Sequence, residues 1–189
     1  MNRTMLLNYL ICSILFIFFS FFVFRIVVRN DYHKKQKLSA VSYLLELVVF
    51  AIHANMMYFF IPAKWPNLPQ LTSDSILLVV FSVFLFVGFI ILILAWFGLG
   101  TASSFGLDKE GLKTTGIYQY TRNPQLLGYG LILLSFIILY PSWYSLSWFV
   151  QYVIISYFMI LSEEEFLRLR YGKKFEDYCN TVPRIIRIS

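Results

Sequence analysis

Long apolar runs, separated by short polar stretches, limit what this chain can fold into more than any other feature of its sequence. A helix that crosses a lipid bilayer needs about 20 mostly apolar residues in a row. Five runs approach or exceed that length, and the fourth is the shortest: Leu6–Val28, Ala40–Ile61, Ile76–Leu99, Pro124–Tyr140 and Trp143–Leu161. We therefore predict an all-α integral membrane protein with five transmembrane helices and a C-terminal surface helix on the cytoplasmic side.

The composition agrees with a membrane location. The chain is 59% hydrophobic and only 14% charged, whereas soluble domains contain about 25% charged residues. The first run follows Arg3 closely, as in a signal peptide, but it is longer than a signal sequence and no small-residue cleavage site follows it. We expect this run to be kept as a membrane anchor, and residues 1–189 to form a single domain.

Basic residues are distributed unevenly among the polar stretches. Of the 16 Lys and Arg residues, all except Arg3 and Lys64 fall at the first loop, the third loop or the C-terminal tail. With five spans these three segments share one side of the membrane, so the positive-inside rule predicts an N-outside, C-inside topology. The same rule explains the net charge of +6 more simply than nucleic-acid binding, which we do not expect. The sequence shows no cluster of metal ligands, and its two cysteines do not suggest a disulfide framework.

The stretch from Gly116 to Gly128 is where a polar loop turns into the fourth apolar run. Asn123 and Pro124 fit the N-cap and the first position of a helix. A helix start carries unpaired N–H groups and the positive end of the helix dipole, so it favours anions. Arg122 adds a cation, and Tyr118 and Tyr120 add aromatic faces. We expect a small anionic or zwitterionic ligand here, although a membrane-anchoring arginine at an ordinary helix start is the simpler alternative.

The tail after the fifth run is the second informative stretch. Ser162 and Glu165 have the spacing of a capping box, and Glu164 and Arg168 are four residues apart, as in a helical ion pair. Gly172 is expected to end or kink this helix. We predict that the helix leaves the membrane as an extension of the fifth span and then lies on the surface.

Two patterns in this order resemble a known family. The loop pattern is G-x-Y-x-x-x-R-x-P-x-x-x-G, and the tail pattern is E-E-x-x-L-x-x-x-x-G-x-x-F-x-x-Y, followed by Val182-Pro183-Arg184. Together they resemble the isoprenylcysteine carboxyl methyltransferases and their relatives, the phospholipid N-methyltransferases. The resemblance covers residues 98–186, about half of the chain.

The resemblance implies an integral-membrane methyltransferase that uses S-adenosylmethionine and takes its lipid substrate from the bilayer. It assigns the catalytic roles to Arg122, Glu163 and Glu164. It also implies a set of cofactor-binding residues in the loop and at the helix start: Glu110, Gly111, Leu112, Lys113, Tyr118, Asn123, Pro124, Gln125 and Leu126.

The sequence departs from the family pattern at several positions. Family members usually have His at the places of Asn123 and Glu110, and often Tyr at the place of Leu126. Prenylcysteine enzymes commonly have an arginine one turn before the acidic pair, where this chain has Met159 or Ile160. The missing arginine weakens the case for a free carboxylate substrate, because such a group favours a bidentate partner.

We expect S-adenosylmethionine-dependent methyl transfer to a lipid or a lipidated small molecule at the cytoplasmic face. Isoprenylcysteine-type carboxyl O-methylation is the first choice, and N-methylation of phosphatidylethanolamine is the alternative. A sterol-reductase-like NADPH enzyme and a non-catalytic scaffold or small transporter are alternatives from other classes. The membrane is expected to be the plasma membrane in a prokaryote or the endoplasmic reticulum in a eukaryote.

The second run also contains Glu46, His53 and Asn55. Glu46 and His53 are seven residues apart and so share one helix face. Ionisable residues inside a span are candidates for function. Alternatively, Glu46 pairs with Lys35 or Lys37, and His53 hydrogen-bonds a neighbouring helix.

Overall fold

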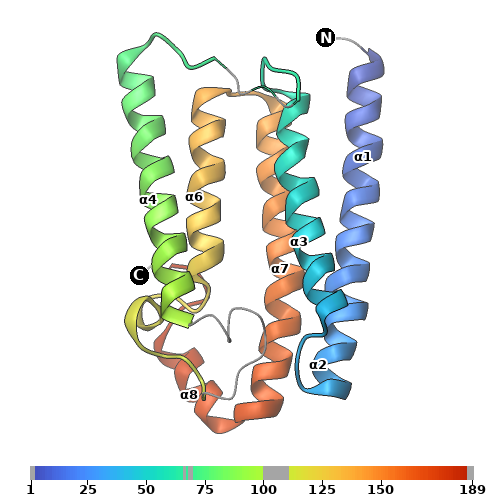
Figure 1. The fold of residues 1–189 in the computed structure, drawn as a ribbon, viewed down its shortest axis with the longest axis vertical. Helices are drawn as coiled ribbons and strands as arrows, with labels where there is room; N and C mark the ends of the chain where they lie inside the picture. The colour runs from blue at the N-terminus through green and yellow to red at the C-terminus, as the bar shows by residue number, and fades with distance from the viewer. Residues whose placement is uncertain (1–2, 66, 68–69, 100–110, 187–189) are drawn as a thin grey trace.

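The computed structural model of the protein describes residues 3–65, 67, 70–99 and 111–186, and this part of the chain is helical without strands. Figure 1 shows α1, α3, α4, α6 and α7 side by side along the long axis, with α2 and α8 together at the end opposite the N-terminus. The helices are α1 Arg3–Phe21, α2 Arg29–Lys35, α3 Ala40–Asn55, α4 Ser75–Leu99, α6 Pro124–Leu139, α7 Trp143–Tyr171 and α8 Lys173–Thr181.

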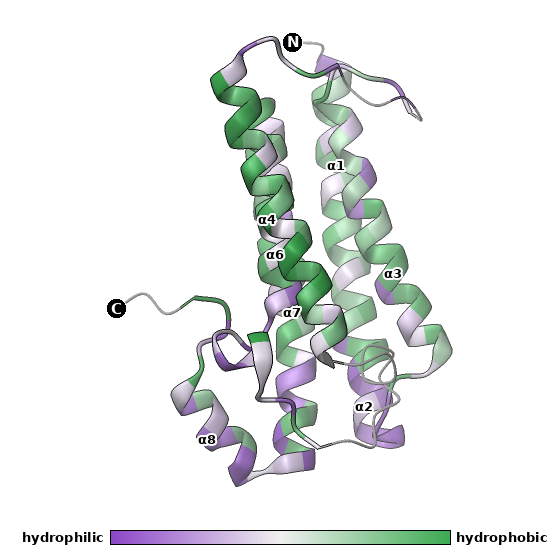
Figure 2. Cartoon of the chain, turned by 60° about the vertical axis from the view of Figure 1, so that its left-hand side comes forward, coloured by the Kyte–Doolittle hydropathy of each residue, from purple (hydrophilic) through white to green (hydrophobic). Residues whose placement is uncertain are grey.

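Four helices are long and apolar enough to cross a membrane: Arg3–Lys35, Ala40–Phe59, Ser75–Gly98 and Trp143–Tyr171. The protein is therefore an integral membrane protein with all-helical architecture. The fourth predicted span, α6, has only 16 residues, which rise about 24 Å, less than the roughly 30 Å of a hydrocarbon core. Figure 2 shows that hydrophilic residues gather on α2, α8 and the adjacent end of α7, away from the apolar shafts.

The first helix is longer than the sequence predicts. It runs unbroken from Arg3 to Lys35, because α1 passes through a π-helical segment, Phe22–Val28, directly into α2. It ends at Gln36, whose left-handed backbone (φ 55°) stops the helix. The extension is polar and lies beyond the apolar run, so a helix predicted from hydropathy alone ends too early.

Short polar contacts fix the turns between the helices. Ser39 caps the start of α3 by accepting a hydrogen bond from the N–H of Ser42, and the Asp31 carboxylate accepts hydrogen bonds from both serine hydroxyls. At the other end of the bundle, Ser142 and Ser145 form a reciprocal capping box at the start of α7. These contacts satisfy N–H groups that a helix start leaves unpaired.

Two glycines allow α4 and α6 to approach closely. A Cβ atom added to Gly88 would lie 2.7 Å from the carbonyl oxygen of Gly128, and a Cβ added to Gly128 would lie 2.7 Å from the carbonyl oxygen of Gly88. Small residues at such a contact let two membrane helices pack backbone against backbone. The contact fixes where α6 begins, and hence where the Gly116–Gly128 loop meets the bundle.

His53 is a core residue that joins three helices. It is fully buried, and its Nδ1 and Nε2 each lie 3.0 Å from a partner on a neighbouring helix, the Tyr129 hydroxyl and the Trp148 carbonyl. The Trp148 indole N–H donates to the His53 carbonyl at 2.6 Å, and the two rings stack at 5.1 Å. The expectation that His53 hydrogen-bonds a neighbouring helix is confirmed.

Candidate functional site

A cavity of about 320 Å³ opens at the end of the bundle where α2 and α8 lie. Its walls come from α2, α3, α4, the loop before α6, the first turn of α6, the second half of α7, and α8. The volume is within the range of about 300–1,000 Å³ typical of small-molecule sites.

Ten of the twelve residues predicted for the site line this cavity: Gly111, Leu112, Lys113, Tyr118, Arg122, Asn123, Gln125, Leu126, Glu163 and Glu164. Pro124 begins α6 as predicted, but it is buried behind the cavity wall. Glu110 lies outside the described residues. The fold thus gathers residues from two distant sequence patterns around one space.

The loop before α6 is held by tyrosine hydroxyls. Gly116 adopts a left-handed backbone (φ 65°), and a short 3₁₀ turn, Gly116–Gln119, then buries Tyr118. The Tyr118 hydroxyl accepts a hydrogen bond from Gln125 at 2.6 Å and donates one to the Ala95 carbonyl at 3.4 Å. The Tyr178 hydroxyl donates to the Tyr118 carbonyl at 2.6 Å. The loop is therefore tied to α4, α6 and α8 at once.

Asn123 occupies the predicted N-cap position, but its side chain does not cap the helix. Its amide Nδ2 instead donates to the Arg184 carbonyl at 2.9 Å, which also accepts a hydrogen bond from the Thr121 hydroxyl at 3.1 Å. The backbone N–H of Arg122 donates to the Pro183 carbonyl at 2.9 Å. The predicted position of Asn123 is therefore correct, but the expected side-chain cap is not formed. The C-terminal tail returns to the start of α6, and its Arg184 carbonyl binds the Asn123 amide instead.

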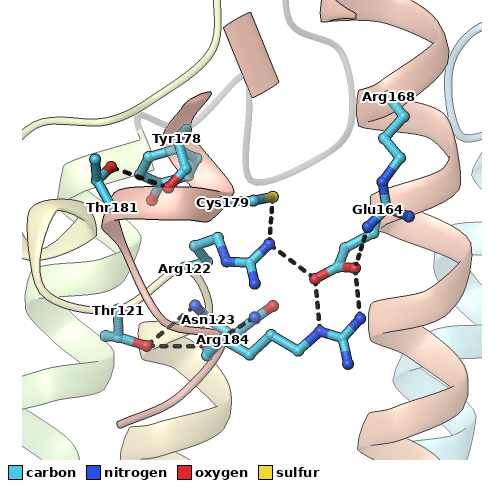
Figure 3. A network of polar contacts seen from close by, with 9 residues as sticks. All are labelled: Thr121, Arg122, Asn123, Glu164, Arg168, Tyr178, Cys179, Thr181 and Arg184. Atoms are coloured by element: carbon cyan, nitrogen blue, oxygen red, sulfur yellow. Dashed lines mark hydrogen bonds and ion pairs between the residues drawn. The ribbon is translucent and has the colours of Figure 1, made fainter. Parts of the chain in front are cut away.

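Glu164 is the centre of an arginine cluster, which we define as Arg122, Glu164, Arg168 and Arg184 (Figure 3). Arg184 binds the carboxylate with two nitrogens, both at 2.8 Å, while Arg122 and Arg168 each approach it at 3.0 Å. The carboxylate side chain is only 5% exposed. The predicted pair between Glu164 and Arg168 is confirmed, and the cluster joins α7 to the loop and the tail.

Arg122 faces into the protein. Its side chain is 12% exposed, and Nη1 also donates to the Cys179 sulfur. Its Nε atom is buried and has no hydrogen-bond partner, although buried polar groups are generally paired. The guanidinium also lines the cavity, where its positive charge is suited to an anionic group of a ligand.

Glu163 and Glu46 form the opposite kind of surface, which we call the carboxylate wall. Both line the cavity. Neither side chain has an ion pair or hydrogen bond within the described part of the chain. The alternative in which Glu46 pairs with Lys35 or Lys37 is wrong: Lys35 binds Asp31 at 2.6 Å, and Lys37 forms no ion pair among the described residues.

Ser162 is not a helix cap. Helix α7 continues unbroken through it, so no free helix start exists for a capping box. Its hydroxyl instead donates to the Phe24 carbonyl at 2.7 Å, and Glu165 pairs with Arg25 at 2.7 Å and Arg29 at 2.5 Å. Ser162 and Glu165, whose spacing resembles a capping box, instead bind α7 to the first helix.

Burial makes the phenols and the thiol at the cavity poor proton acceptors. It raises the pKa of Tyr178 to about 12, even though the nearby Arg122 charge opposes the shift. Burial also raises the pKa of Tyr118 well above its usual range and the pKa of the Cys179 thiol. These groups keep their protons near neutral pH, so the unpaired carboxylates Glu46 and Glu163 are left as proton acceptors among the described residues that line the cavity.

Aromatic residues that the sequence patterns do not indicate also line the cavity. The Tyr32 and Phe166 rings stack at 4.4 Å with an interplanar angle of 10°, and Trp96 adds a further aromatic side chain. The sequence patterns do not indicate Tyr32 as a site residue, because it lies in the part of the first helix beyond the predicted span. Tyr120, by contrast, is 70% exposed and does not line the cavity.

Comparison with known proteins identifies the family. The family model described as phospholipid methyltransferase matches residues 72–174, which span α4, the loop, α6, all of α7 and the start of α8. No curated protein and no solved structure matches the chain. The family match favours methyl transfer over the reductase and scaffold alternatives. The chain belongs to the phospholipid methyltransferase family, and it is an integral-membrane methyltransferase that acts on a lipid.

Proposed function

We propose that the protein transfers a methyl group from S-adenosylmethionine to the amine of an ethanolamine-type phospholipid. The observation that carries this proposal is the unpaired Glu163 carboxylate in the cavity. An amine acceptor is a cation in water and must lose a proton before its nitrogen can accept a methyl group. Because the phenols and the thiol hold their protons, Glu163 is the group that takes this proton.

The cavity suits S-adenosylmethionine on several counts. The Arg122 guanidinium lines the cavity and offers a positive charge to the carboxylate of the ligand, and the start of α6 favours the same negative charge. Leu112, Lys113 and Gln125 provide further apolar and polar contacts along one wall. When bound, the cofactor supplies an electrophilic methyl group on a sulfonium, and such a cation is stabilised by aromatic faces and carboxylates.

Carboxyl O-methylation of the isoprenylcysteine type is the second candidate. Arg122 favours it, because its guanidinium lines the cavity and can pair with a substrate carboxylate. The carboxylate wall opposes it, since Glu46 and Glu163 would repel a negatively charged acceptor. For this reason the amine acceptor comes first.

We further propose five spans in an N-outside, C-inside topology, with the cavity on the cytoplasmic side and residues 1–189 forming one domain. In support, α6 stands alongside α4 and α7 in the bundle although it is short. Most of the described basic residues lie towards the end of the bundle that holds the cavity, as the positive-inside rule requires of the cytoplasmic end.

The test is a methyl-transfer assay with purified protein in liposomes and labelled S-adenosylmethionine. Phosphatidylethanolamine and a prenylcysteine analogue are offered as acceptors. Phosphatidylglycerol serves as a control without an amine, and phosphatidylcholine as a control whose amine is already fully methylated. We expect label in phosphatidylethanolamine and in neither control. Label only in the prenylcysteine analogue would replace the amine proposal by the carboxyl one, and label in no acceptor would contradict both.

A further inference from the structure

Glu46 is a carboxylate that the family match does not cover. It lies on α3, outside the matched residues 72–174, and it lines the cavity. A carboxylate on a membrane helix is costly unless it is paired or serves a ligand. Glu46 has no such partner among the described residues.

Three other carboxylates near this end of the bundle, on α2 and α7, are each paired with a cation. Asp31 binds Lys35 at 2.6 Å, Glu165 binds Arg25 at 2.7 Å, and Glu164 is held in the arginine cluster. The carboxylate wall, in contrast, forms no ion pair among the described residues. A cationic group of a ligand would therefore find an uncommitted carboxylate there.

The position of Glu46 indicates which ligand group it meets. The residues proposed for the cofactor lie on the loop and the first turn of α6, whereas Glu46 lines the cavity from α3, and Tyr32 and Leu38 line it from α2 and the turn between these helices. The stacked rings of Tyr32 and Phe166 add an aromatic surface to the same cavity. A cavity that combines a carboxylate with aromatic faces is a typical binding environment for an organic ammonium.

We infer that Glu46 binds the ammonium group of the acceptor lipid and makes the site selective for cationic head groups. This inference rests on the proposed amine acceptor. In it, Glu163 takes the proton that the nitrogen must lose, while Glu46 pairs with the ammonium and positions the head group. Because methyl transfer to the neutral amine leaves an N-methylammonium cation, the same contact retains the product for a further methyl transfer.

The experiment compares wild type, Glu46→Gln and Glu46→Asp in liposomes that contain phosphatidylethanolamine. We expect Glu46→Gln to raise KM for the lipid about tenfold or more, since a hydrogen bond to a charged group is lost. We also expect kcat and S-adenosylmethionine affinity to change much less. The products should shift towards the monomethylated lipid, and Glu46→Asp should fall between wild type and Glu46→Gln. Glu176→Gln, which removes the same charge from an exposed position of α8, should behave as wild type.

The outcomes separate the inference from the function on which it rests. A wild-type protein that methylates no amine lipid contradicts the proposed function. If wild type is active and Glu46→Gln leaves the lipid KM and the product distribution unchanged, only the role of Glu46 is overturned. A loss of cofactor affinity with unchanged lipid KM also overturns it, because Glu46 would then face the sulfonium. Should Glu46→Gln not fold, Glu46→Asp decides in its place: a raised lipid KM supports the role, and a wild-type KM overturns it.

Discussion

The arginine cluster and the carboxylate wall are two regions of one cavity with opposite electrostatic character. Glu164 is surrounded by three guanidinium groups, while its neighbour Glu163 has no counter-ion in the described structure. Adjacent residues on a helix point about 100° apart, so one carboxylate reaches the tail and the other faces the cavity. The comparison teaches that the first carboxylate mainly holds the site together and that the second is available for chemistry.

The two regions also complement each other. The arginine cluster has three cations for one anion and leaves the Nε of Arg122 unused, so it presents excess positive charge. The carboxylate wall presents excess negative charge across the same space. A zwitterionic ligand satisfies both sides, and both S-adenosylmethionine and an ethanolamine phospholipid contain groups of both signs.

Among the substitutions that test this contrast, Glu164→Ala should have the largest effect, and the effect should be on stability. Three arginines would lose their shared counter-ion, and Arg122 would remain buried without it. We expect a loss of about 3 kcal/mol in stability, reduced somewhat by the solvent around the half-exposed Arg168 and Arg184. Thermal unfolding followed by tryptophan fluorescence measures this loss, with the exposed Glu176→Ala as a control. Unfolding at the wild-type temperature would show that the cluster does not hold the site together.

Replacing Glu163 by Gln should separate chemistry from stability. The amide keeps the shape of the side chain but cannot accept the proton of the acceptor amine. We expect methyl transfer to fall by about 100-fold or more, while the unfolding temperature stays close to that of wild type. If Glu163→Gln retained full activity, or if it unfolded like Glu164→Ala, the assignment of different tasks to these two residues would fail.

Arg184→Lys tests how the tail is attached. A lysine keeps the charge but not the two parallel hydrogen bonds to Glu164. We expect a cost of about 1 kcal/mol and faster proteolysis after residue 181, because the returning segment opens more often. Cleavage at the wild-type rate would mean that the backbone contacts at Pro183 and Arg184 are sufficient to hold the tail.

Arg168→Ala should have the smallest effect within the cluster. Arg168 is 47% exposed and pairs with Glu164 along the same helix, and such pairs contribute about 0.3–0.5 kcal/mol. We expect a barely measurable change in unfolding temperature and no change in activity. An effect as large as that of Arg184→Lys would show that the three arginines act as one unit.

The membrane helices were predictable from the sequence because hydropathy is a local property. The predicted run Ile76–Leu99 is α4 within one residue, and α6 and α7 begin at Pro124 and Trp143 as predicted. Gly172, with a left-handed backbone, ends α7 where expected. These features follow from residues that are neighbours in the chain.

The partners of charged groups were less predictable, because they come from distant segments. Arg25 and Glu165 are 140 residues apart, and Arg122 reaches Glu164 only because the loop folds under α7. The sequence lacks the arginine that prenylcysteine enzymes have one turn before the acidic pair, and Met159 lines the cavity there instead. In the structure Arg122 and Arg184 bring guanidinium groups to Glu164 from other segments, which no local spacing reveals.

Binding of S-adenosylmethionine to the purified protein, measured by calorimetry, tests the cavity as the methyltransferase site most directly. Arg122→Ala and Arg168→Ala are titrated beside wild type, and tryptophan fluorescence confirms that each variant is folded. We predict micromolar binding by wild type, weaker binding by Arg122→Ala, which loses a cavity-lining donor, and unchanged binding by Arg168→Ala, which does not line the cavity. Absence of binding to folded wild-type protein, or equal binding by all three, would contradict the assignment of this cavity.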